Sequence, residues 1–331
     1  MTADREARAL GAAAAAFVLL LVVAATTRLT GDDPGAAGDP GPVAVPAPGG
    51  AAPSSEETRP PAPADPAPPV PSTHAPDGHI FGGNRFLVAY YGTGQTPSLG
   101  VLGEAGPDEM HRRLQRAAKP FQRPDSRVTL VYELIVTIAD GRPGPDGDYS
   151  HDVPREVVQR YVDAARRHGA LLLLDIQTGR APFIDVARRL AWALREPHVG
   201  LALDPEWRMA KDEVPGRVIG AVRPQEVNYV SAWLDAFTAR QGLPEKLFVL
   251  HQFRTDMIPN IERVETRANL AMVQHVDGFG TPGQKLDTYR AVARHDRFHM
   301  GFKLFYDEDV DRMSPRDVRR VRPAVRFVSF Q

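Results

Sequence analysis

Hydrophobic and polar positions divide the chain into three parts: an apolar segment near the N-terminus, a polar proline-rich stretch, and a long region of regular alternation. In the last part, short runs rich in β-branched and aromatic residues recur between amphipathic stretches. This pattern predicts strands that alternate with helices. The eight predicted strands are 85–92, 128–139, 170–177, 199–207, 246–253, 269–279, 299–307 and 325–330.

The stretches between these runs repeat their apolar positions at helical spacing. In 153–168, Val158 and Tyr161 fall on the same face, and 182–194 and 224–241 are similar. Amphipathic helices alternating with near-continuous apolar strands are typical of parallel sheets that are covered on both faces.

Eight such units predict a (β/α)8 barrel over residues 84–331. The alternative is a doubly wound open sheet. The eighth run ends one residue before Gln331, so the sequence offers no final helix. We therefore expect either that the end of the proline-rich stretch covers the place of this helix or that the barrel is incomplete.

Residues 9–27 form a run of nineteen residues without a charge, close to the roughly 20 that cross a bilayer. We interpret this segment as a transmembrane anchor behind a cytoplasmic tail, residues 1–8. The competing interpretation is a cleaved signal peptide, because 23–25 resembles a small-residue cleavage site. The first case predicts a single-pass protein of the cell membrane with an extracellular domain, and the second predicts a secreted one.

The stretch 28–83 follows the apolar segment. Residues 31–78 contain 14 of the chain's 31 prolines, together with Ala, Gly, Ser and Asp. Such a composition buries too little apolar surface to offset the entropy of ordering, so we expect a disordered linker.

The overall composition removes several classes of function. Lys and Arg number 40 against 41 Asp and Glu, which speaks against a nucleic-acid-binding protein. The chain has no cysteine, so it has no disulfide, no thiolate metal site and no lipid-modified cysteine. We expect no cofactor and no metal, and we expect the membrane and a carbohydrate or cell-wall material as partners.

In a (β/α)8 barrel the active site lies at the carboxyl ends of the strands, and polar or aromatic residues follow most of the predicted strands here. Burying such groups costs several kcal/mol unless they are paired, so packing alone does not account for them. The candidate substrate-binding residues are Tyr90, Tyr91, Glu133, Gln177, Trp207, His251, Gln252, His275, Asp277, Lys303, Phe305 and Tyr306.

The motif LALDPEWRM (201–209) provides the sharpest catalytic candidates. Asp204 and Glu206 are two residues apart, so on a strand they point the same way. Neighbouring carboxyl groups push their pKa values apart, as hydrolysis of a glycosidic bond requires. Asp175, at the end of the third strand, is the third candidate. The alternative is a turn that Asp204 caps.

Two further alternatives concern the other charged residues. Glu133 lies inside a long apolar run and is either a substrate-binding residue or the buried partner of Lys303. His251, His275 and Asp277 are candidate metal ligands, although the usual spacing of paired histidines is absent, which favours structural or substrate-binding roles.

The eight-run rhythm, the opening FLVAYYGTGQTPSLGVLGE (86–104) and LDPEW (203–207) resemble the glycoside hydrolase-like (β/α)8 barrels, in particular secreted or membrane-anchored barrel proteins of actinobacteria. In many barrel glycosidases an acid/base carboxylate closes the fourth strand, and the resemblance places that role on Glu206. The chitinase-type D-x-x-D-x-D-x-E run is absent, since LLLLDIQTG (171–179) supplies only Asp175.

Three functions remain open from the sequence. The first is a surface-anchored glycoside hydrolase acting on an envelope polysaccharide or glycan, with Asp175, Asp204 and Glu206 in one cleft. The second is an inactive barrel that binds glycan or serves as a scaffold, with these carboxylates tied to Lys303, Arg254 or Arg208. The third is a metal-dependent hydrolase.

Overall fold

The computed structural model describes residues 73–331. The expected cytoplasmic tail, the expected anchor at 9–27 and most of the expected linker lie outside the described residues. Within 73–331, no helix has the length and apolar character needed to cross a membrane.

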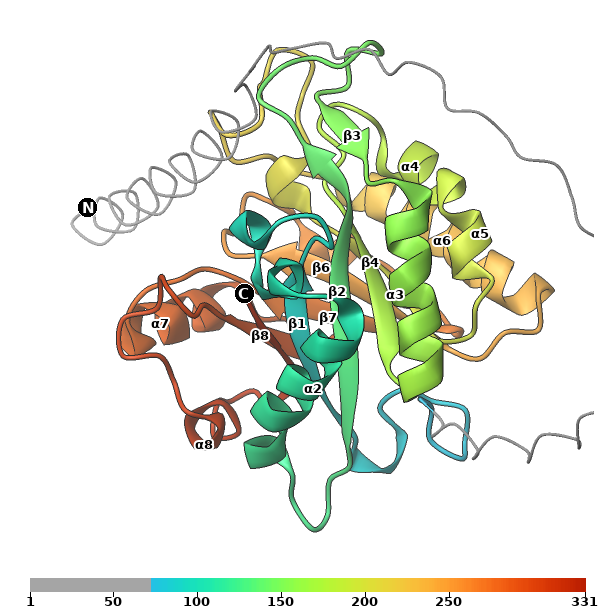
Figure 1. The fold of residues 1–331 in the computed structure, drawn as a ribbon. Coiled ribbons are helices and arrows are strands. Elements are labelled where there is room, and N and C mark those ends of the chain that lie inside the picture. The colour runs from blue at the N-terminus through green and yellow to red at the C-terminus, as the bar shows by residue number, and fades with distance from the viewer. Residues whose placement is uncertain (1–72) are drawn as a thin grey trace, which may run out of the picture.

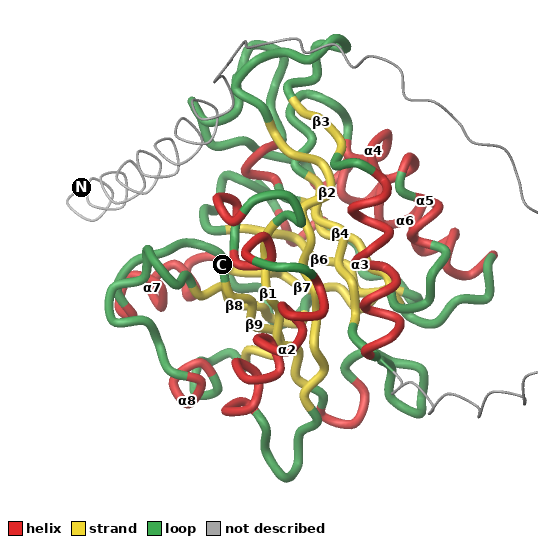
Figure 2. The backbone as a smooth tube through the Cα atoms, in the orientation of Figure 1, coloured by secondary structure: helices red, strands yellow, loops and turns green. Residues whose placement is uncertain are grey.

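Eight parallel strands form a closed barrel, as the sequence predicts (Figures 1 and 2). The order around the barrel is β1-β9-β8-β7-β6-β5-β4-β2, and β1 pairs with β2 to complete the circle. This closure rules out the open sheet. The strands are β1 (Phe86–Gly92), β2 (Val128–Ala139), β4 (Leu171–Ile176), β5 (Val199–Leu203), β6 (Lys246–Gln252), β7 (Leu270–Val276), β8 (His299–Leu304) and β9 (Val325–Phe330).

Helices surround the barrel and bury the outer face of the strands in one apolar cluster. Four of them begin with a proline, whose fixed φ suits the first helical turn. The helices are α2 (Pro107–Ala118), α3 (Arg155–His168), α4 (Phe183–Arg189), α5 (Ala191–Leu194), α6 (Pro224–Arg240), α7 (Pro282–Val292) and α8 (Pro315–Val318).

Two features depart from the expected alternation. Strand β3 (Ser150–Asp152) pairs antiparallel with the end of β2 and was not predicted. No helix follows β9, yet the barrel is complete. The outer face of β1 and β9 is covered instead by the 3₁₀ turn Lys119–Phe121, where the ring of Phe121 lies 5.4 Å from Phe86 and 6.1 Å from Phe330.

Every second side chain of a barrel strand points into the lumen. Below the carboxyl ends of the strands this interior holds one apolar cluster, and we call it the lower lumen. It consists of Leu87, Ala89, Val131, Leu171, Leu173, Ala202, Leu247, Val249, Ala271, Val273 and Phe327.

The end of the proline-rich stretch closes the lower lumen. Ile80 and Phe81 are buried and belong to the same interior cluster. Their backbone is held by two side chains: the carboxylate of Glu245 accepts from Ile80 N at 2.7 Å, and Arg326 Nη2 donates to the Phe81 carbonyl at 2.7 Å. The packed structure therefore includes residues upstream of 84, and we call 74–81 the basal strap.

Candidate active site

All eight barrel strands place a polar side chain in the lumen near their carboxyl ends, directly above the apolar layer. On seven strands this polar residue lies two positions after a lower-lumen residue, and on β8 it lies two positions after Gly301. Side chains two positions apart on a strand point the same way, so each polar side chain also points into the lumen. All are at most 5% exposed. This upper lumen consists of Tyr91, Glu133, Asp175, Asp204, His251, His275, Lys303 and Ser329.

His251 lies at the centre of an ionic network in the upper lumen. Its Nδ1 is 2.8 Å from Asp277 Oδ2, and its Nε2 is 3.2 Å from Glu133 Oε1. The ammonium of Lys303 is 3.3 Å from the same Asp277 oxygen. The alternative that Glu133 forms an ion pair with Lys303 is wrong: the Lys303 ammonium contacts Asp277, and Glu133 pairs with His251.

The electrostatics follow from this geometry. Burial opposes the charged form of His251, but the charge and hydrogen bond of Asp277, reinforced by Glu133, hold its pKa well above the usual range. Burial likewise opposes ionisation of Asp277, yet the positive charges of His251 and Lys303 hold its pKa well below the ordinary value. The network is therefore two carboxylates balanced by two cations.

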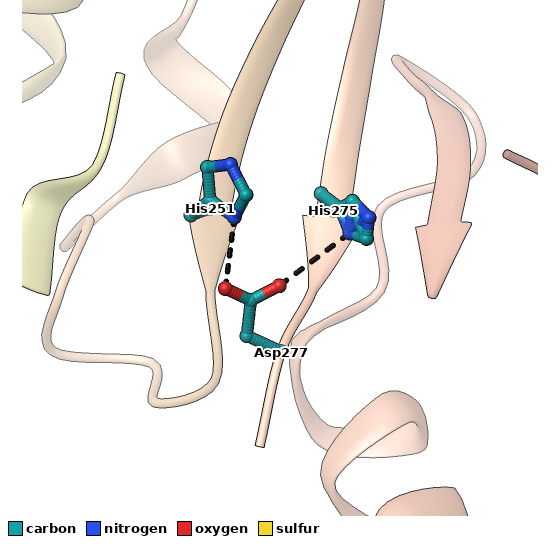
Figure 3. Close-up of side chains that lie close together, drawn as sticks. All are labelled: His251, His275 and Asp277. Carbon is teal, nitrogen blue, oxygen red and sulfur yellow. Dashed lines mark hydrogen bonds and ion pairs between the residues drawn. The ribbon is translucent and has the colours of Figure 1, made fainter. Parts of the chain in front are cut away.

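His275 completes this group without carrying a charge. Its ring stacks on His251 with centroids 5.2 Å apart, and its Nε2 is 2.9 Å from Ser329 Oγ. Burial is the main cause that lowers the pKa of His275 to about 4, so it is neutral at pH 7. Figure 3 shows Asp277 between the two rings, 3.4 Å from His275 Nδ1 on one side.

His251, His275 and Asp277 bring their ligand atoms within 4.8 Å of one another, as a metal site would require. The donor set nevertheless fits a cation poorly. The ammonium of Lys303 already lies against Asp277, and both His251 nitrogens face carboxylates. A metal ligand must offer a lone pair, which an imidazolium does not have.

The three catalytic candidates come from two neighbouring strands. Asp175 ends β4 and is fully buried, and Asp204 follows β5 and is 4% exposed. Glu206 lies in the 3₁₀ turn Pro205–Trp207 at the mouth of the barrel and is half-buried. Asp204 also caps this turn, since its Oδ1 accepts from Glu206 N at 3.2 Å. The turn interpretation of this motif is therefore confirmed. The expectation that Asp204 and Glu206 alternate along a strand is wrong, because β5 ends at Leu203 and the chain turns at Pro205.

A close backbone contact fixes the position of this turn. Gly220 N donates to the Glu206 carbonyl at 2.7 Å, and a Cβ at Gly220 would lie only 2.5–2.7 Å from the carbonyl oxygens of Arg208, Pro205 and Glu206. Only glycine allows this approach, so the turn that carries Glu206 packs tightly against the returning part of the same β5–α6 loop.

Burial and mutual repulsion raise the pKa of all three candidates. Burial is the first cause in each case, opposed by the charge of His251. The pKa of Asp204 rises to about 6 and that of Asp175 to about 7. Glu206 also faces the charges of Asp204 and Asp277, and its pKa is held well above the ordinary value. Asp204 is therefore mostly ionised at neutral pH, and the shift at Glu206 favours its protonated form.

The candidate carboxyl groups have no cation of their own. Arg208 pairs with Glu226 at 2.9 Å, Arg254 pairs with Asp256, and Lys303 contacts Asp277. Among residues 73–331, both oxygens of Asp175 and Oε1 of Glu206 are buried without a hydrogen bond of ordinary geometry, as are both oxygens of Glu133 and Oδ1 of Asp277 in the ionic network. Unpartnered buried oxygens of this kind are rare in native proteins and point to a ligand or ordered water.

Other predicted substrate-binding residues flank this group. Gln177 Nε2 donates to the Tyr91 hydroxyl at 3.2 Å, and the Lys303 ammonium lies 3.6 Å from the centre of the Tyr91 ring. The charge of Asp175 adds to burial in raising the pKa of Tyr91 well above its usual value. Tyr91 is therefore a neutral hydroxyl group beside the candidate carboxylates.

Two predicted residues point away from the lumen. Tyr90 alternates with Tyr91 and belongs to the outer cluster, 6.3 Å from Phe330. Gln252 alternates with His251, and it accepts from Gln274, whose amide also donates to the α7 residue Val292. The structure thus places neither with the other site residues.

The remaining predicted residues lie at the mouth. Trp207 is half-buried beside Glu206, Phe305 is 8% exposed after β8, and Tyr306 is 36% exposed. Phe279, which the sequence analysis did not select, lies 5.9 Å from Phe305. These rings provide flat apolar surface on two sides of the mouth.

Ser329 was also missed in the sequence. It sits in VRFVSF as a small hydroxyl residue between apolar ones, which strand patterning alone does not distinguish from packing. Only its position two residues beyond the interior Phe327, on the last strand, shows that it faces His275.

No protein-family model matches the chain, and a search of curated proteins finds no match. The solved structures that are similar include two of the Parabacteroides merdae β-glucuronidase. The one with glycerol in its active site has 11% identity and a TM-score of 0.37, covering 74% of this chain and 31% of that one. The other has 12% identity and a TM-score of 0.35, covering 72% and 31%. The chain spans about a third of their length, and likenesses of this size say nothing about its chemistry.

Proposed function

We propose that the chain is a glycoside hydrolase-like enzyme that cleaves a polysaccharide or glycan of the cell envelope. The observation that supports this most is the pair Asp204 and Glu206, two carboxyl groups at the mouth of the barrel that are linked by the Glu206 N–H and form no ion pair with any described residue. Burial raises the pKa of both groups. A glycosidase needs one carboxylic acid to protonate the leaving oxygen and one carboxylate on the other side of the bond.

Each group has a role in this proposal. Glu206, protonated and nearest the mouth, donates its proton to the glycosidic oxygen. Asp204, ionised, acts as nucleophile or as the base that activates water. Asp175 and Tyr91 lie next to Asp204, and we assign them to hydrogen bonding with sugar hydroxyl groups, which would occupy the unpartnered oxygens of Asp175.

The ionic network below supports this division. His251 and Lys303 both lower the pKa of Asp204, and so favour its carboxylate, while Asp277 pushes the other way. The two carboxylates and two cations of the network nearly cancel in charge. The network therefore holds its own protonation state and does not take protons from Asp204 or Glu206. Trp207, Phe279 and Phe305 would stack on sugar rings at the mouth.

The membrane anchor and the external location are part of the same proposal and rest on the sequence pattern of residues 9–27 and the linker. A domain held outside the cell on a proline-rich spacer would meet wall and capsule glycans. This is the reason for choosing an envelope glycan as the substrate class.

A direct test incubates the full-length protein with purified peptidoglycan and with envelope polysaccharide, and follows new reducing ends. We expect release by the wild type, strong loss in Glu206→Gln and Asp204→Asn, and full activity in Glu262→Gln, an exposed acid away from the site. Equal release by wild type and Glu206→Gln would contradict the proposal.

A second candidate is a barrel that binds glycan without cleaving it. Its support is the depth of the site: Asp175 is fully buried and Asp204 only 4% exposed. It predicts that wild type and Glu206→Gln retain the same glycan on an affinity column and that neither releases reducing ends.

A further inference from the structure

The lower end of the barrel carries a group of basic side chains that have no acidic partner. They come from two segments, the loop 119–127 before β2 and the segment 319–326 that leads from α8 into β9. We call this group the basal cationic surface. Five of the six are exposed and Arg326 is half-buried: Lys119, Arg123, Arg127, Arg320, Arg322 and Arg326.

Arg319 joins the two segments. Its Nη2 donates to the Phe121 carbonyl at 2.5 Å and to Ser126 Oγ at 3.2 Å, and its guanidinium lies 3.7 Å from the centre of the Phe86 ring. Burial is the main cause that lowers the pKa of Arg319 to about 10; the charges of Arg123 and Arg326 add to it, and that of Asp125 opposes it.

The cations of this surface are not neutralised by acidic side chains of the described residues. Some arginines elsewhere in the barrel are paired, for example Arg166 with Glu196 at 2.7 Å and Arg189 with Asp152 at 2.9 Å. None of the six basal cations forms an ion pair with any residue in 73–331.

The nearby acids do not neutralise the surface. Asp317 accepts from Ser314 Oγ at 2.6 Å, and Glu245 is engaged by His79 at 3.1 Å and by Ile80 N. Asp125 is the remaining acid of loop 119–127, against three basic residues there. The basic side chains of this surface are therefore available to bind an external anion.

The position of the surface indicates its partner. The basal strap, through which the chain enters the described fold, lies at this same end, and Arg326 donates to the Phe81 carbonyl within it. The candidate active site is at the opposite, carboxyl end of the strands (Figure 1). Upstream of the strap the sequence holds the apolar run 9–27 that we interpret as a membrane anchor.

We propose that the basal cationic surface binds the anionic headgroups of the membrane to which the chain is tethered, and so points the candidate active site away from the lipid. Each Lys or Arg near an anionic bilayer contributes about 1 kcal/mol, and the attraction falls off within a Debye length. The interaction is therefore expected to depend on both lipid charge and salt.

The absence of native cysteine makes a site-specific test possible. A fluorophore is attached to Gln122→Cys on the basal loop of the full-length protein, or to Asp212→Cys on the exposed loop near the mouth as the matched control. Each protein is added to vesicles of phosphatidylcholine alone or with phosphatidylglycerol, both containing a headgroup quencher.

We expect quenching at position 122 to be much stronger on phosphatidylglycerol vesicles and to return to the neutral-vesicle level in 1 M NaCl. Position 212 should respond to neither lipid charge nor salt. The paired substitution Arg320→Gln and Arg322→Gln should weaken the charge-dependent association by about 30-fold, while melting stays within a few degrees of the wild type.

Equal quenching at position 122 on neutral and anionic vesicles would overturn the proposal, as would equal quenching at the two positions. Soluble polyphosphate that binds the protein as tightly as the vesicles do would show a surface for free polyanions and would also overturn the lipid assignment. None of these outcomes depends on hydrolytic activity.

Discussion

The two ends of the lumen are built by the same strands and differ completely in chemistry. The lower end is apolar and is plugged by Ile80 and Phe81. The upper end, one alternation further along each strand, holds carboxylates, histidines and a lysine at nearly the same depth of burial. The apolar layer of the lower lumen therefore stabilises the fold by packing. The charged groups of the upper lumen are not explained by packing alone.

The difference also explains which polar groups are functional candidates. In the upper lumen, Glu133, His251, Asp277 and Lys303 neutralise one another. Asp175, Asp204 and Glu206 do not, and their raised pKa values mark stored electrostatic cost. Carboxyl groups with raised pKa values and no cationic partner are typical of functional sites.

The largest expected effect is at Glu206. If it is the general acid, Glu206→Gln should lower kcat by roughly 10²–10⁴-fold on substrates with a poor leaving group. The loss should be much smaller on an aryl glycoside whose leaving group needs no proton. Steady-state kinetics on the two substrate types check this, and equal losses on both would remove the acid role.

Substitutions at the lower end of the lumen should change the stability of the fold. Phe81→Ala removes a buried ring from the plug and should lower the free energy of unfolding by about 3–5 kcal/mol. Phe279→Ala, at the half-buried mouth, is the matched control and should cost much less. Denaturant unfolding measures both, and a Phe81→Ala protein as stable as the wild type would mean that the basal strap does not close the barrel.

Asp175→Asn should stabilise the protein at neutral pH. The folded pKa of Asp175 is about 7 and its unfolded pKa is near 4, so folding takes up a proton between these values. Its contribution is fully present below pH 4 and is lost as the pH rises through 7. The gain from Asp175→Asn should therefore be larger at pH 8 than at pH 5, reaching roughly 1–4 kcal/mol. A gain independent of pH would contradict the raised pKa.

The smallest expected effect is the difference between removing the hydroxyl group of Tyr91 and removing that of its neighbour Tyr90. Tyr91→Phe removes the hydroxyl beside Asp175 and should shift the acid limb of the pH–rate profile. Tyr90→Phe loses only a long contact of 3.4 Å with the Tyr306 hydroxyl, outside the lumen, and should change stability by less than about 0.5 kcal/mol. Equal effects on the profile would mean that the two faces of β1 are not separated as described.

Much of the fold follows from hydrophobic pattern. All eight predicted runs contain a barrel strand, because an apolar core on both faces leaves a near-continuous signature. Strand β3 was missed because three polar residues, Ser150–Asp152, carry no such signature. The basal strap was missed because two apolar residues in a proline-rich context, Ile80 and Phe81, acquire their role only from the barrel that they close.

The sequence predicted which kinds of residue line the candidate site, but not which way each side chain points or which side chains pair. The ends of the predicted strands identified the polar residues. In adjacent pairs such as Tyr90–Tyr91 and His251–Gln252, however, the sequence does not show which of the two side chains points into the lumen and which points outward. The pairing of side chains was likewise not predictable from the sequence. Lys303 lies on β8 and Asp277 follows β7, and the pairing of these two strands brings the side chains together.

The central claim is that Glu206 remains protonated at neutral pH while Asp204 is ionised. Carbon-13 NMR of the side-chain carboxyl groups, assigned with Glu206→Gln and Asp204→Asn, measures this directly. We predict that the Glu206 signal shows the acid form at pH 7 and that Asp204 titrates near 6. Both carboxyl groups titrating below pH 5 would contradict the account.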